Sequence, residues 1–183
     1  MKIGLCGAGG TGKGTLATAL SQELKIPMIS SSVEWVGKTL NPSSDNYSKI
    51  TDEARVVFQV TSVMVQAQSE RLYESFVTER TILDYLAYAY QFMPGYYQDY
   101  DDLVMRLLTQ NPYDVVFYLP IEFEPKDESS WKERSDTRKE TDRFLYNLLF
   151  ETNLSVTAEE LHGTVEERVK QAKDYLMKRG MLS

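Results

Sequence analysis

Short apolar runs alternate along the chain with longer segments in which apolar residues recur every three or four positions. The short runs predict strands over residues 2–6, 27–31, 75–79, 114–119 and 154–157. The periodic segments predict a helix through Leu16, Leu20 and Leu24 and further helices near 52–73, 82–92, 100–110 and 163–179. This alternation is typical of βα units, so we expect an α/β fold with a five-stranded parallel sheet flanked by helices.

One polar segment interrupts the alternation after the fourth predicted strand. Residues 125–142, PKDESSWKERSDTRKETD, are almost wholly polar, and apolar positions resume with a further predicted helix at Phe144 and Leu145. Because 183 residues suit one domain, we interpret the segment as a polar lid within a single domain, 1–183. A solvated charged loop is the alternative.

The charge balance restricts the partners. Twenty basic and 27 acidic residues give a net charge of -7, which argues against nucleic acid or a membrane surface as a partner. Cys6 is the single cysteine, and no apolar run is long enough to span a bilayer. We therefore expect a cytoplasmic protein, and a homodimer stays open.

A glycine-rich stretch, GAGGTGKG, lies between the first predicted strand and helix. Such a turn at a helix N-terminus presents backbone N–H groups to phosphate, and Lys13 would reach the outer phosphates. The candidate nucleotide-binding residues are Gly7, Gly9, Gly10, Thr11, Gly12, Lys13, Gly14 and Thr15.

The stretch departs from the Walker A pattern at Gly14, where Ser or Thr is usual. In this it resembles the adenylate kinase form of the loop, which implies a small-molecule kinase that uses ATP and Mg²⁺. Position 14 offers no hydroxyl to the metal, although Thr15 follows it. We therefore expect Mg²⁺ to depend on water, nucleotide oxygens and acidic side chains elsewhere.

The third predicted strand ends in Glu79-Arg80, at the sheet edge where open α/β sheets bind ligands. Glu79-Arg80-Thr81 resembles the Asp/Glu-Arg-Ser motif of deoxynucleoside kinases and of nicotinamide-riboside-kinase-like P-loop proteins. The resemblance implies that Glu79 holds Mg²⁺ or its waters, that Asp84 supports the metal, and that Arg80 binds phosphate or the acceptor. A surface ion pair that caps the strand is the alternative.

Glu34 follows the second predicted strand, where the same kinases place an acid that can deprotonate an acceptor hydroxyl. It is our candidate base, although a charge that merely suits a helix N-terminus is an equal alternative. The long helix near 52–73 carries Gln59, Gln66 and Glu70, of which the glutamines could read a base edge or a sugar. We expect most such residues to be solvated.

Phosphoryl transfer often uses an arginine that arrives on closure of a lid. Arg134 and Arg138 occupy the polar segment, and the resemblance to nucleoside and nucleotide kinases singles out the SDTR that ends in Arg138. The LHGTVEERV stretch resembles the turn that frames adenine in these kinases, which makes Gly163, Thr164 and Val165 adenine-contact candidates. His162, the single histidine, is expected to be an ordinary surface side chain.

The resemblance to small P-loop kinases covers most of the chain. It implies an ATP-dependent phosphotransferase with a small-molecule acceptor, a nucleoside monophosphate and preferably a deoxynucleotide. A nucleoside kinase, a kinase of modified bases in DNA, and a P-loop ATPase or switch protein with a macromolecular partner are the alternatives.

Overall fold

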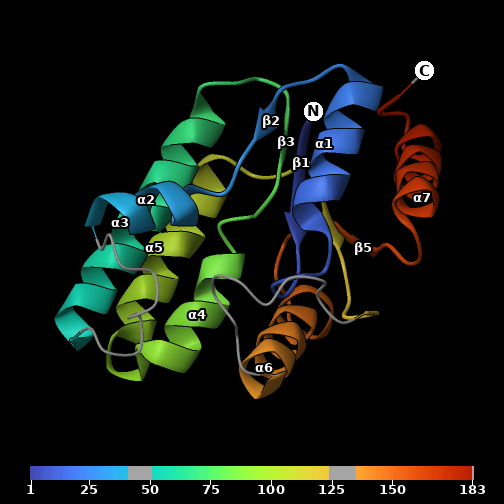
Figure 1. Cartoon of the computed structure of the whole chain (residues 1–183). Helices are drawn as coiled ribbons and strands as arrows, with labels where there is room; N and C mark the ends of the chain where they lie inside the picture. Colours follow the sequence, from blue (N-terminus) through green and yellow to red (C-terminus); the bar gives the residue numbers. More distant parts are fainter. Residues whose placement is uncertain (41–50, 124–134, 183) are drawn as a thin grey trace.

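The computed structural model describes residues 1–40, 51–123 and 135–182. Its five strands form one parallel sheet in the order β2-β3-β1-β4-β5, as Figure 1 shows. The strands are β1 (Lys2–Cys6), β2 (Met28–Ile29), β3 (Phe76–Thr78), β4 (Val115–Tyr118) and β5 (Ala158–Glu160). The predicted α/β fold with a five-stranded parallel sheet is therefore confirmed, and all strands end at one edge of the sheet.

Helices cover both faces of this sheet. The helices are α1 (Lys13–Leu24), α2 (Ser32–Leu40), α3 (Asp52–Arg71), α4 (Asp84–Phe92), α5 (Tyr97–Gln110), α6 (Ser135–Tyr146) and α7 (Val165–Lys178). Two short turns, η2 (Pro94–Tyr96) and the π-helical η3 (Asn147–Glu151), precede α5 and follow α6. Within the described ranges, no helix is both long and apolar enough to cross a membrane.

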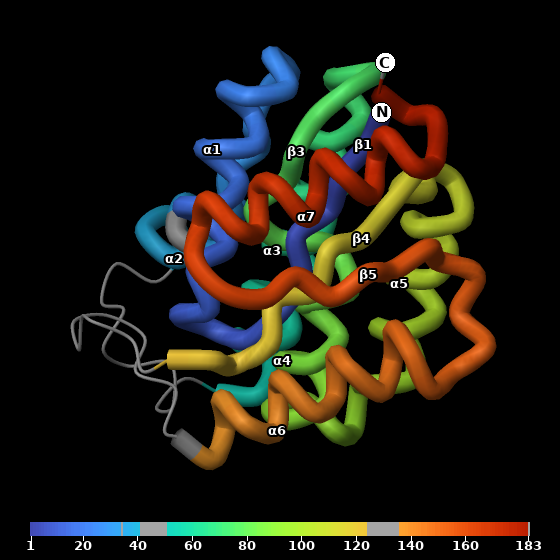
Figure 2. Tube along the Cα trace, turned by 90° about the vertical axis from the view of Figure 1, so that its right-hand side faces the viewer, coloured from blue at the N-terminus to red at the C-terminus, as the bar shows by residue number. Residues whose placement is uncertain are grey.

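The central strands supply side chains to two separate cores, because successive residues of a strand point to opposite faces. Val115 and Phe117 of β4 pack with apolar residues of α1 and α7. Val116 and Tyr118 pack with those of α3, α4 and α5. Figure 2 shows α7 crossing in front of the sheet, with α4 and α6 beneath the carboxyl ends of its strands.

The fifth strand lies later in the chain than predicted. The sequence predicts this strand at residues 154–157, but β5 begins at Ala158. Of the predicted residues, only Thr157 bonds to the sheet, where its carbonyl accepts from Val116 N at 2.8 Å. Leu154 and Val156 pack against the core without strand pairing. The apolar run that suggested a strand therefore contributes to the core, whereas two of the three residues of the edge strand are glutamates.

The second part of the polar segment is helical, and its role as a lid stays a prediction. Helix α6 begins at Ser135, so residues 135–142 are helical, and the first part of the segment lies outside the described residues. Arg138, Thr141 and Leu145 form a buried stripe at helical spacing. The first two of these are polar, so a search for apolar periodicity could not detect the beginning of this helix.

Candidate active site

The glycine-rich loop connects β1, the middle strand, to α1. Gly10 and Gly12 adopt positive φ angles of 71° and 91°, which favour glycine. A Cβ at Gly7 would lie 2.5 Å from the carbonyl oxygen of Leu119. Lys13 is buried, and its Nζ donates to the carbonyl oxygens of Gly7 and Ala8 at 2.5 and 2.7 Å. The ammonium group therefore lies over the loop that would surround a phosphate.

The Glu79 side chain lies beside Gly14, the position at which the loop departs from the Walker A pattern. A Cβ at Gly14 would lie 2.9 Å from Oε1 and 3.3 Å from Cδ of Glu79. The other carboxylate oxygen, Oε2, accepts from Ser31 N at 3.2 Å. The Glu79 carboxylate thus fills the space next to position 14 and connects the first turn of α1 to the end of β2. Thr15, the next hydroxyl, is exposed.

Asp84 lies beneath the loop and is fully buried. Its Oδ1 accepts from Gly7 N at 3.2 Å, and its Oδ2 accepts from the backbone N and the hydroxyl of Thr81 at 2.9 and 2.7 Å. Asp84 therefore joins the turn after β3 to the first residue of the loop. Because both carboxylate oxygens of Asp84 already accept hydrogen bonds within the protein, these contacts suit a structural role beneath the phosphate site better than direct metal coordination. The predicted support of a metal by Asp84 stays a prediction.

Arg80 follows Glu79 and is held against an aromatic ring. Its guanidinium carbon lies 5.2 Å from the centre of the Tyr88 ring. Burial lowers the pKa of Arg80, but the nearby Tyr88, Asp84 and Tyr85 outweigh this effect and raise the pKa, so the side chain remains charged. A fixed positive charge therefore stands at the carboxyl end of β3.

Arg138 joins α6 to the glycine-rich loop. Its Nε donates to the carbonyl of Gly9 at 2.8 Å and its Nη2 to the carbonyl of Phe123 at 2.9 Å. The side chain is 6% exposed and comes from a helix, and its predicted role in phosphoryl transfer stays a prediction. Arg134 lies outside the described residues, and its predicted role is untested.

Arg168 of α7 also contacts the loop, and the sequence analysis missed it. The side chain is buried, and its Nη1 donates to the carbonyl of Thr11 at 2.7 Å. Its Nη2 pairs with Glu122 Oε2 at 2.6 Å, and the guanidinium lies 5.4 Å from the centre of the Phe123 ring. Arg168 is four residues before the buried Ala172, so its place on the apolar stripe of α7 was a usable signal.

The predicted adenine-contact residues lie at the beginning of α7, next to Arg168. Gly163 N donates to Glu122 Oε2 at 2.9 Å. Thr164 is the N-cap and forms a reciprocal capping box with Glu167, and Val165 is the first helical residue. The hydrogen bonds of this turn are internal to the protein, and a contact with adenine stays a prediction.

His162 is exposed but is held by two carboxylates. Its Nδ1 lies 2.9 Å from Glu122 Oε1 and its Nε2 lies 3.1 Å from Glu160 Oε2. The expected surface position of this imidazole is therefore confirmed, and the ring in addition connects the end of β5 to the segment that follows β4.

The acceptor side is formed by α2, α3 and the end of β3. Glu34, the candidate base, belongs to the first turn of α2. The expectation that the polar residues of α3 are solvated is wrong for Gln59, Gln66 and Glu70, all of which are buried. Helix α3 packs against α2, α4 and α5, so more than one of its faces is covered.

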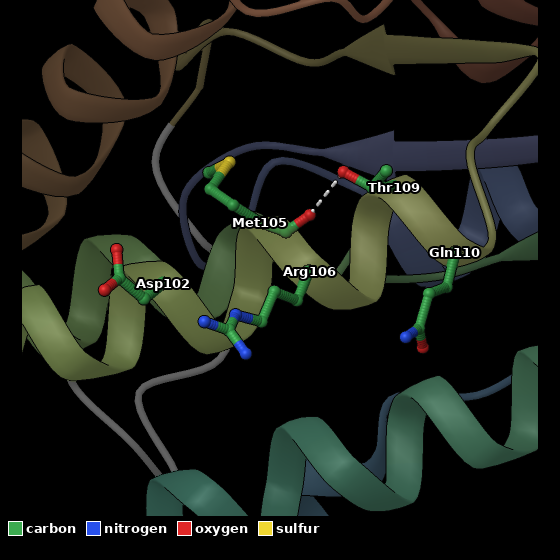
Figure 3. Close-up of a pocket in the computed structure, with 5 residues that line it drawn as sticks. All are labelled: Asp102, Met105, Arg106, Thr109 and Gln110. Carbon is green, nitrogen blue, oxygen red and sulfur yellow. Dashed lines mark hydrogen bonds between the residues drawn. The ribbon is translucent and has the colours of Figure 1, made fainter.

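A surface depression lies elsewhere on the molecule. It has a volume of about 430 Å³ and runs along α5, where Figure 3 shows its lining side chains, Asp102, Met105, Arg106, Thr109 and Gln110. The last of these residues is near the beginning of β4, whereas the glycine-rich loop follows the end of β1. The depression therefore lies away from the candidate active site.

A glycine-rich loop after the central strand of a parallel sheet, with a buried lysine at the start of the next helix, defines a P-loop nucleotide-binding domain. A family model described as an AAA domain matches residues 2–168, and the chain belongs to this family. No curated protein matched the sequence.

Several solved structures share this fold at low sequence identity. Deoxyadenosine kinase from M. mycoides, with the products dCMP and dCDP, is 16% identical with a TM-score of 0.74, and the match covers 97% of this chain and 99% of that one. NadR in complex with NAD and AMP-PNP is 15% identical with a TM-score of 0.76 over 100% of this chain and 50% of that one. NadR in complex with NR is 18% identical with a TM-score of 0.70, and the match covers 97% of this chain and 50% of that one. This chain thus has the α/β fold of P-loop kinases and spans half of the NadR chain.

Proposed function

We propose that this protein is an ATP-dependent kinase that transfers the γ-phosphoryl group to a nucleoside monophosphate, with a deoxynucleotide preferred. The observation that carries the proposal is the position of Glu79. Its carboxylate lies against Gly14 of the P-loop on one side and accepts from Ser31, directly before α2, on the other. A carboxylate between the phosphate loop and a second binding region suits transfer to an acceptor better than hydrolysis alone.

Lys13 and the backbone N–H groups of the loop would bind the β- and γ-phosphates of ATP. The carboxylate of Glu79 and the hydroxyl of Thr15 are hard oxygen donors, which fit Mg²⁺. Bound Mg²⁺ would neutralise charge on the phosphate oxygens. Arg138, which bonds to the Gly9 carbonyl, is close enough to the loop to stabilise charge that develops during transfer.

On the acceptor side, Arg80 supports an anionic substrate. Within the described part of the chain, no carboxylate forms an ion pair with this guanidinium, and its charge is stabilised by Tyr88 and the nearby Asp84. A phosphate monoester is a natural partner for such a group. Glu34, in the first turn of α2, is the proposed group that orients or deprotonates the acceptor oxygen.

A nucleoside acceptor is the second candidate. The observation in its favour is the similarity in fold, over nearly the whole chain, to a protein named deoxyadenosine kinase. Such an enzyme would make a monophosphate, whereas the preferred candidate would make a diphosphate.

The test is a measurement of ADP release with ATP and Mg²⁺ across nucleosides and nucleoside monophosphates, with chromatography to identify the product. Lys13→Ala is expected to abolish turnover, and the exposed Lys178→Ala serves as a matched control with wild-type turnover. A nucleoside diphosphate product supports the proposal, and a monophosphate product supports the second candidate. Turnover that no acceptor raises above the hydrolysis background would refute both and favour an ATPase or switch protein.

A further inference from the structure

Gln66 is fully buried in α3, and both ends of its side-chain amide have partners. The carbonyl oxygen accepts from Ser32 N at 3.3 Å and lies 3.5 Å from the Tyr85 hydroxyl. The amide nitrogen donates to the hydroxyl of Thr78 at 2.7 Å and to Glu70 Oε1 at 3.0 Å. One end of this amide therefore faces donors, and the other faces acceptors.

The carbonyl end of Gln66 holds the beginning of α2. Ser32 is the first residue of that helix, and its hydroxyl donates to the carbonyl of Ser62 at 2.7 Å. The same hydroxyl lies 2.6 Å from the Tyr85 hydroxyl of α4. The first turn of α2, which carries Glu34, is thus attached to α3 and α4 through buried polar groups.

The amide nitrogen of Gln66 holds the segment that follows β3. The Thr78 hydroxyl, which accepts from Gln66, donates to the carbonyl of Arg80 at 2.9 Å. Glu70, the second acceptor, also accepts from the Tyr113 hydroxyl at 2.8 Å, and that hydroxyl in turn accepts from Ile82 N at 3.0 Å. Residues 78–82, which include Glu79, are therefore connected to the same amide.

We propose that Gln66 is a positioning residue that sets the distance between the two sides of the acceptor site. This inference rests on the proposed function, because it takes α2 and Glu79-Arg80 as those two sides. Gln66 is too deeply buried to touch a substrate, so it acts through Ser32 and Thr78. An apolar side chain in place of this amide would leave buried polar groups unpaired. An acidic side chain would bring a second carboxylate to Glu70.

The test compares Gln66→Met with Gln68→Met, an exposed glutamine of the same helix. Hydrogen–deuterium exchange in Gln66→Met is expected to rise by about tenfold or more in peptides covering 28–40 and 76–84, with β4 unchanged. In steady-state kinetics, kcat/KM for the acceptor is expected to fall about tenfold or more, while the KM for ATP stays within about twofold. Gln68→Met is expected to match the wild type in both measurements.

Equal increases in exchange in β4, 28–40 and 76–84 would overturn the inference, because they would show that Gln66 only stabilises the fold. Equal changes in the KM for ATP and for the acceptor would also overturn it. If the wild type phosphorylates no acceptor, the proposed function fails, and the exchange comparison alone then decides whether Gln66 connects the two segments.

A second variant covers the case in which Gln66→Met does not fold. Thr78→Val keeps the shape of the side chain and removes the hydroxyl that accepts from Gln66 at the end of β3. Exchange is expected to rise in 76–84 and to stay unchanged in 28–40. If hydrogen–deuterium exchange in the 76–84 peptide stayed unchanged, the proposed connection between Gln66 and this segment would be refuted.

Discussion

Replacement of Glu70 with glutamine is expected to remove a pH dependence from the stability of this protein. Glu70 is 1% exposed, and burial raises the pKa of its carboxyl group from 4.5 to about 7, although Gln66 and Tyr113 donate hydrogen bonds to it. Between these two values the unfolded chain releases the proton while the folded chain keeps it. The free energy of unfolding therefore falls as the pH rises from about 4.5 to about 7, and then levels off.

The size of this effect follows from the shift in the pKa. Each unit is about 1.4 kcal/mol, so the rise from 4.5 to about 7 corresponds to about 3 kcal/mol of stability lost above neutral pH. A glutamine side chain at this position would have the shape of the protonated acid and no charge. Glu70→Gln should therefore match the wild type near pH 4 and exceed it by about 3 kcal/mol near pH 8.

Urea unfolding followed by circular dichroism, at a series of pH values from about 4 to about 8, measures this difference. Glu74→Gln, which changes an exposed glutamate just beyond α3, serves as the matched control and should leave the wild-type profile unchanged. If Glu70→Gln and the wild type have parallel profiles across this range, the buried carboxyl group does not titrate as argued.

Three further variants test the P-loop and its surroundings. Gly14→Ser restores the usual Walker residue, but its Cβ would lie 2.9 Å from Glu79 Oε1. The value of kcat/KM should therefore fall about tenfold, and the Mg²⁺ concentration that gives the half-maximal rate should rise. Arg138→Ala should lower kcat about 100-fold in the ADP-release assay, whereas the exposed neighbour Lys139→Ala should not change it. Arg168→Met removes the hydrogen bond to the loop and the ion pair with Glu122, which keeps its contacts with His162 and Gly163, so urea unfolding should show a loss of about 2 kcal/mol.

The parts of the fold that the sequence predicted well depend on local chemistry. The glycines fit the loop because positive φ angles and close backbone contacts restrict which residues are tolerated there. The buried strands were visible as apolar runs. These features can be recognised within a few residues of chain.

The parts that were missed depend on polar groups whose partners are distant in the sequence. Gln66 and Glu70 look like solvated helix residues until the fold brings Ser32 and Thr78 to the first and Tyr113 to the second. The beginning of α6 was hidden for the same reason, since Arg138 and Thr141 are polar residues on its buried stripe. Apolar periodicity identifies a buried face only where apolar residues line it, and here hydrogen bonds to the backbone and to other side chains compensate for burial.

The glycine at position 14 involves both a local sequence signal and a contact with a residue that is distant in the sequence. The sequence suggested that acidic groups replace the missing hydroxyl, but it could not say why a hydroxyl was not kept as well. The structure gives a steric reason, because a side chain at Gly14 and the present position of the Glu79 carboxylate exclude each other. Glycine at this position therefore lets the Glu79 carboxylate lie against the loop as it does here, whereas a Cβ would require this flexible side chain to shift. If Gly14→Ser kept full activity with an unchanged Mg²⁺ requirement, Glu79 would have to move without cost, and its proposed role at the metal would be lost.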